Sequence, residues 1–61
     1  MTRDEALAEA QRRWGPGSRI SDDDFPNTYV LWRRLDSFRL VTVGIGDSWE
    51  DAFLDADRRA K

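Results

Sequence analysis

The feature that most constrains the fold is an alternating apolar segment that is interrupted by glycine and followed at once by a helical pattern. Residues 38–45 (FRLVTVGI) carry β-branched and apolar side chains with a period of two, which predicts a β-strand. After Gly46 and Asp47, the hydroxyl of Ser48 can cap a helix. The apolar side chains then recur three and four residues apart, which predicts a helix with one buried stripe, formed by Trp49, Ala52, Phe53, Ala56 and Ala60.

The preceding part of the chain predicts a helix and two further strands. Thr2 and Glu5 have the spacing of a capping box, which places a helix over residues 3–13, and Gly15-Pro16 ends it. Residues 17–21 are expected to form a short edge strand and residues 28–35 a second strand, separated by an acidic loop. We therefore expect a single α+β domain over residues 1–61, with a three-stranded antiparallel sheet and both terminal helices on one face.

The hairpin between the second and third strands predicts which side chains share a face. If Asp36-Ser37 is a tight two-residue turn, Trp32 lies opposite Val41 and Val30 lies opposite Val43. The face expected under the helices then carries Val30, Trp32, Val41, Val43 and Ile45. The other face is also apolar and is expected to be open, although a register shifted by one residue would exchange the two faces.

Composition leaves little for catalysis. The chain has no cysteine and no histidine, so a disulfide framework and a zinc site built from those residues are excluded. No serine has a nearby general base, and no carboxylate pair is placed for acid–base chemistry. We expect no enzymatic activity, no cofactor, no bound metal and no small-molecule substrate. Asp22-Asp23-Asp24 lacks the spacing of a calcium loop and is expected to be a solvated turn.

The charge and hydropathy patterns also limit the location and the partners. The formal net charge is −2, so the total charge does not favour long-range attraction to nucleic acid. No apolar run approaches the length of a membrane span, and the N-terminus lacks the apolar region of a signal peptide. We therefore expect a cytoplasmic location and no membrane partner.

The spacing Gly44-x-Gly46-x-Ser48-x-x-x-Ala52-x-x-x-Ala56 resembles the C-terminal half of double-stranded-RNA-binding domains, which share the same order of helices and strands. The resemblance implies an α-β-β-β-α fold. It does not carry over the RNA contacts, because the second helix of that family begins with lysines that bind phosphates, whereas this chain has Trp49 and Glu50 there. The loop that would enter a minor groove corresponds here to the three aspartates.

The apolar side chains on the open face predict a binding surface, because large exposed apolar patches on small proteins mark interfaces. We expect a protein partner, or a second copy in a homodimer, to contact Leu31, Arg33, Leu35, Phe38 and Leu40. The alternative is a nucleic-acid-binding module in which Tyr29, Arg34 and Arg39 contact an anion or a nucleic acid, since arginines near aromatic rings suit single strands. The arginines could instead only shield the open face.

Overall fold

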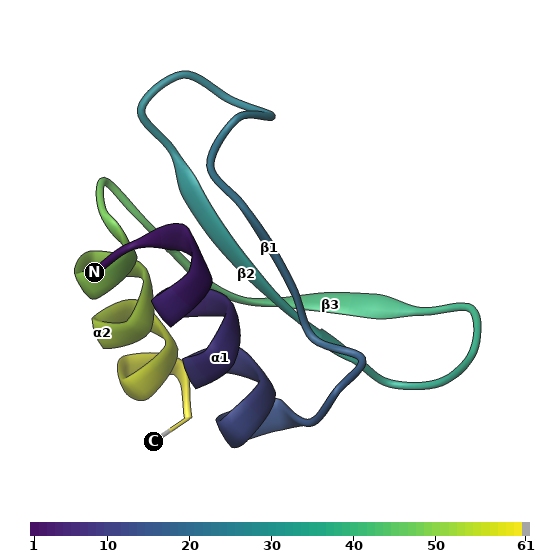
Figure 1. Cartoon of the computed structure of the whole chain (residues 1–61). Helices are drawn as coiled ribbons and strands as arrows, with labels where there is room; N and C mark the ends of the chain where they lie inside the picture. The colour runs from purple at the N-terminus through teal and green to yellow at the C-terminus, as the bar shows by residue number, and fades with distance from the viewer. Residues whose placement is uncertain (61) are drawn as a thin grey trace.

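The computed structural model describes residues 1–60, which form two helices and a three-stranded antiparallel sheet. The elements follow one another in the order α1 (Arg3–Trp14), β1 (Arg19–Ser21), β2 (Tyr29–Arg34), β3 (Leu40–Gly46) and α2 (Trp49–Arg59). Figure 1 shows both helices on the same side of the sheet, with the β2–β3 hairpin extending away from them. The predicted α+β class and the order of the elements are confirmed.

Both helices begin at the caps that the sequence predicts. Thr2 Oγ1 accepts a hydrogen bond from Glu5 N at 3.1 Å, and Glu5 Oε1 accepts one from Thr2 N at 2.8 Å. Ser48 Oγ accepts a hydrogen bond from Asp51 N at 3.1 Å at the start of α2. These bonds satisfy backbone donors that have no partner within the helix. Gly15 follows α1 with φ at 92°, a left-handed conformation that favours glycine.

The loop that joins β2 to β3 is one residue longer than predicted. Leu35 N donates a hydrogen bond to Arg39 O at 3.0 Å, so the loop consists of residues 36–38. Asp36 Oδ1 accepts a hydrogen bond from Phe38 N at 2.9 Å, which is the side-chain equivalent of a backbone turn. The predicted two-residue turn is therefore wrong, because the Asp36 carboxylate closes a three-residue loop.

A bulge in β3 shifts the strand pairing a second time. Trp32 lies opposite Thr42, whereas Leu31 lies opposite Gly44, so Val43 between them has no partner on β2. The extra residue bends the strand and displaces the pairs beyond it. The longer loop alone places Trp32 opposite Thr42, one position from its predicted partner Val41, and the bulge adds a second shift that places Val30 opposite Ile45 instead of Val43. The predicted register is therefore wrong along the hairpin.

Contacts between glycines and an alanine determine which face of the sheet lies under α2. A Cβ atom at Gly44 would lie 2.3 Å from the carbonyl oxygen of Ala52, and one at Gly46 would lie 2.5 Å from Ala52 N. No side chain fits at either position, so both glycines face the helix and Ile45 between them points to the other face. The prediction that Ile45 and Val30 pack under the helices is wrong, since these two residues are paired on the opposite face.

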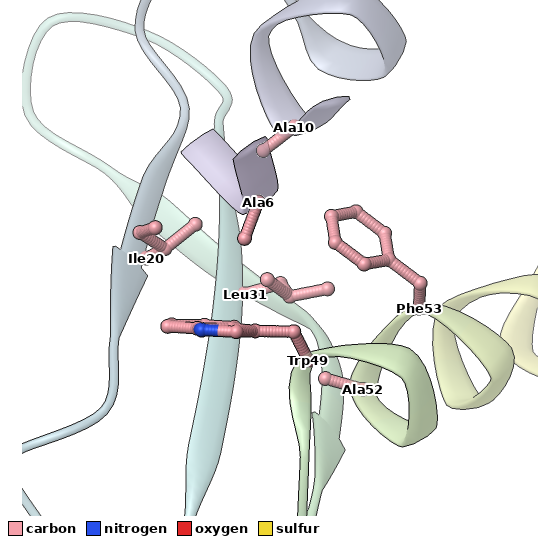
Figure 2. Close-up of a cluster of buried hydrophobic side chains, with 7 residues drawn as sticks. All are labelled: Ala6, Ala10, Ile20, Leu31, Trp49, Ala52 and Phe53. Atoms are coloured by element: carbon pink, nitrogen blue, oxygen red, sulfur yellow. The ribbon is translucent and has the colours of Figure 1, made fainter. Parts of the chain in front are cut away.

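Leu31 is the centre of the core and has no exposed surface. Figure 2 shows its side chain between Ala6 of α1 and the rings of Trp49 and Phe53 of α2. Because alternate residues of a strand face opposite sides, Trp32 points away from the helices, contrary to the prediction. The buried cluster consists of Ala6, Ala10, Ile20, Leu31, Trp49, Ala52 and Phe53, and Leu7, Trp14, Tyr29 and Val43 pack against it.

The two helices run in the same direction. The amino group of Met1 lies 2.8 Å from Glu50 Oε2 at the start of α2, and Arg13 Nη1 lies 2.9 Å from Asp57 Oδ1 near its end. The guanidinium carbon of Arg13 also lies 4.8 Å from the centroid of the Phe53 ring. As a result, the acidic first turns of both helices lie at one end of the molecule and their basic last turns at the other.

Candidate interaction surface

The five residues expected to contact a partner do not share one face. Leu31 is fully buried, so the expectation that it belongs to a contact surface is wrong: the helices cover the face that was expected to be open. Leu40 is half-buried, and Arg33, Leu35 and Phe38 are exposed. These four residues lie on the outer half of the β2–β3 hairpin, beyond the part of β2 that pairs with β1.

The face of the sheet away from the helices exposes less apolar surface than predicted. Val30 is only 4% exposed. Trp32 is half-buried, and the guanidinium carbon of Arg19, its partner on β1, lies 5.8 Å from the centroid of the Trp32 ring. The arginine therefore covers part of the tryptophan through a cation–π contact. This face is not a broad patch that requires a partner.

Exposed apolar side chains lie instead at the tip of the hairpin, which we define as residues 35–39. Phe38 is 96% exposed and Leu35 is 45% exposed. Asp36 holds the loop between them, because Oδ1 accepts from Phe38 N at 2.9 Å and Oδ2 accepts from Arg39 Nε at 2.8 Å. The hydrogen bond from the Phe38 backbone and then that from Arg39 lower the pKa of the Asp36 carboxyl group. The carboxylate is therefore ionised at neutral pH. Its two hydrogen bonds hold the backbone of the tip in one conformation.

The residues expected to contact an anion or a nucleic acid are not brought together. The Tyr29 ring meets the Trp49 ring edge-on, with centroids 4.8 Å apart, at the start of β2. Arg34 is at the other end of that strand. Arg39 Nη2 lies 2.7 Å from Asp36 Oδ2, so its charge already has a partner within the tip. The three side chains do not form a single stacking platform.

A groove that was not predicted lies between the end of β3 and α2, with a volume of about 650 Å³. Its large apolar side chains are Ile45 and Leu54, which are 43% and 59% exposed. Leu54 is a large apolar residue of α2 that lies outside the buried stripe. Its position outside the stripe is the feature of the sequence from which an exposed apolar site on α2 could have been predicted. We refer to this site as the β3–α2 groove; its lining residues are Ile45, Gly46, Asp47, Asp51, Leu54, Asp57 and Arg58.

Asp55 occupies the free edge of β3 beside the groove. Its Oδ2 atom accepts a hydrogen bond from Ile45 N at 3.0 Å and lies 2.9 Å from Arg59 Nε. The hydrogen bond from the Ile45 backbone is the main reason why the pKa of Asp55 is lowered, and Arg59 and Arg58 add to it. Because the outward amide of Ile45 is already bonded, another strand cannot pair with this edge at that point.

Two other features of residues 1–60 bear on ligands and membranes. No group of three acidic side chains within this range is placed to hold a metal ion, and this includes the three successive aspartates. Within the same range, neither helix has the length and apolar character needed to cross a bilayer.

Together these features define a small α+β domain with an exposed apolar hairpin tip and an acidic groove. No protein-family model, curated protein or solved structure matches the chain. The order of the helices and strands is the one expected from the resemblance to double-stranded-RNA-binding domains.

Proposed function

We propose that the protein is a non-enzymatic interaction module that binds another protein through its hairpin tip. Leu35 and Phe38 form the apolar centre of the contact, and Arg33 and Leu40 flank it. The observation that carries the proposal is the 96% exposure of the Phe38 side chain, on a loop that Asp36 closes with two hydrogen bonds.

The energetics of an exposed phenyl group support this surface. A phenylalanine left in water forgoes roughly 1.5–3 kcal/mol relative to one that is buried. Aromatic residues are enriched in the buried centres of protein interfaces. Since the loop is held by hydrogen bonds before binding, a partner would lose little free energy in ordering it. An exposed aromatic side chain on a hydrogen-bonded loop therefore suits an anchor residue.

RNA binding, the activity of the domains that this element order resembles, has less support. The N-terminal end of α2 carries Trp49, which is buried, and Glu50, which is bonded to the amino group of Met1. Neither can bind a phosphate group, and the carboxylates nearby repel one. Binding of single strands by Tyr29, Arg34 and Arg39 also lacks support, because Tyr29 lies at the opposite end of the hairpin from the two arginines.

A photo-reactive phenylalanine at position 38 tests the proposal. Benzoylphenylalanine would replace Phe38 in cells that produce the protein, and irradiation would join the tip to whatever protein it contacts. We expect a discrete cross-linked protein adduct of position 38. Adducts to nucleic acid alone would instead favour the nucleic-acid alternative.

Phe25 provides the matched control. Its side chain is 58% exposed and lies in the β1–β2 loop, away from the hairpin tip. The same photo-reactive residue at position 25 should give little or none of the adduct seen at position 38. Equal labelling from both positions, or no protein adduct from position 38, would contradict the proposal.

A further inference from the structure

The β3–α2 groove has the chemistry to receive a basic, apolar segment. Ile45 and Leu54 supply exposed apolar surface. Around them the lining carries three carboxylates and one guanidinium group, so the groove has an excess of negative charge. The charged residues are Asp47, Asp51, Asp57 and Arg58.

The hairpin of the same chain has the opposite character. Phe38 and Leu35 are its exposed apolar side chains. The outer half of the hairpin, residues 33–40, contains three arginines and one aspartate, so its charge is positive where that of the groove is negative. Arg33 and Arg34 form no ion pair with a carboxylate of residues 1–60, although the charge of Arg34 acts on Asp36 at longer range. Arg33 in particular is available to a partner.

The tip cannot reach the groove of its own chain. The groove lies at the Gly46 end of β3 and the tip precedes the Leu40 end. A strand of this length holds its two ends about 20 Å apart. Figure 1 shows the hairpin loop projecting away from the helices and from the end of β3 that joins α2. Any contact between the two surfaces must therefore join two molecules.

We propose that the hairpin tip of one molecule binds in the β3–α2 groove of a second copy, in a head-to-tail arrangement. The inference rests on the proposed function, since it names the partner of the same tip. Phe38 enters between Ile45 and Leu54, while the arginines of the hairpin lie near Asp47 and Asp51. One end of the assembly keeps a free tip and the other end keeps a free groove, so it grows by adding molecules unless the rotation between them closes it into a ring.

Complementary variants test this arrangement. Phe38→Asp removes the apolar tip, and Leu54→Arg blocks the groove; both side chains are exposed, so both variants should fold. Sedimentation velocity over concentrations from about 10 μM to 1 mM covers the weak affinities typical of small interfaces. The wild-type protein should form species that grow with concentration, and so should Phe25→Asp, an exposed phenylalanine outside both surfaces.

The decisive sample is the mixture of the two variants. Each variant alone should remain monomeric, whereas an equimolar mixture should form a one-to-one dimer that does not grow, because one intact tip meets one intact groove. A monomeric mixture, or a Phe38→Asp variant that still self-associates, would overturn the head-to-tail proposal. If the wild-type protein also stays monomeric while position 38 cross-links to a different protein, this inference fails and the proposed function stands.

Discussion

Two glycines in β3 determine how α2 packs on the sheet. The carbonyl oxygen of Ala52 comes within 2.3 Å of where a Cβ atom of Gly44 would lie, so the helix backbone rests directly on the strand. Gly46 makes a similar approach. Leu31, opposite Gly44 on β2, packs in the buried cluster with Trp49 and Phe53 and is the centre of the core.

Two leucine substitutions test this assignment of faces. Leu31→Ala leaves a cavity among the rings of Trp49 and Phe53 and should lower the free energy of unfolding by roughly 2–5 kcal/mol. Leu54→Ala, on the exposed side of α2, should change it by no more than about 0.5 kcal/mol. Urea unfolding followed by tryptophan fluorescence measures both. Equal losses in the two variants would contradict the described core.

The residues that were misplaced from the sequence share one cause. The five side chains of the face predicted to lie under the helices are all apolar, and this prediction placed Ile45 and Val30 there instead of Gly44 and Leu31. Hydropathy does not specify how closely a helix approaches a strand. The sequence therefore shows the regular spacing of Gly44, Gly46 and Ala52, but not that the two glycines lie against the helix backbone. The physical basis of that spacing is the close packing of α2 on β3.

At the scale of elements, local chemistry predicted the helices and strands well. Caps depend on residues next to one another in sequence, and Thr2, Glu5 and Ser48 form the bonds expected of them. The three-residue loop was not predicted because it depends on the hydrogen bond from Phe38 N to the Asp36 carboxylate. The bulge at Val43 was not predicted because it depends on how β3 packs against the core. The exposed tip residues Leu35 and Phe38 were named from the sequence, whereas the groove was missed.

Asp55 joins α2 to the edge of β3 and makes stability depend on pH. Its pKa is lowered from an ordinary value of 3.8, so its ionised form stabilises the fold above that pH. This contribution is lost as the pH falls through the lower pKa of the folded protein. Asp55→Asn should therefore unfold at a lower urea concentration than the wild-type protein at pH 7, and the difference should shrink well below pH 3.8.

Asp47→Asn is the control for this pH dependence. Asp47 is exposed in the turn before α2, and its carboxylate forms no hydrogen bond with another group of residues 1–60. Its substitution should leave the urea midpoint nearly unchanged at both pH values. A loss in Asp55→Asn that stays the same at every pH would show that the charge of Asp55 does not support the β3–α2 contact.

On the scale of the whole molecule, the parallel helices and the hairpin separate two surfaces of opposite charge. The acidic first turns of α1 and α2 lie at one end, and the β2–β3 hairpin, which contains three arginines, extends away from the helices (Figure 1). One molecule can therefore present both the hairpin tip and the β3–α2 groove, because the tip cannot bind in the groove of its own chain. Opposite charges on two separate surfaces favour contacts between molecules, because they attract the tip of one molecule to the groove of another.

An amide chemical-shift dilution series tests most directly where the protein makes contact. Spectra recorded from low to high concentration report which backbone amides change environment on association. We expect two separate groups of shifts with the same concentration dependence, at residues 35–39 and around Ile45, Asp47 and Leu54, and both should vanish in Phe38→Asp. Shifts centred on Trp32 and Thr42 of the sheet face, or changes that persist in Phe38→Asp, would contradict it.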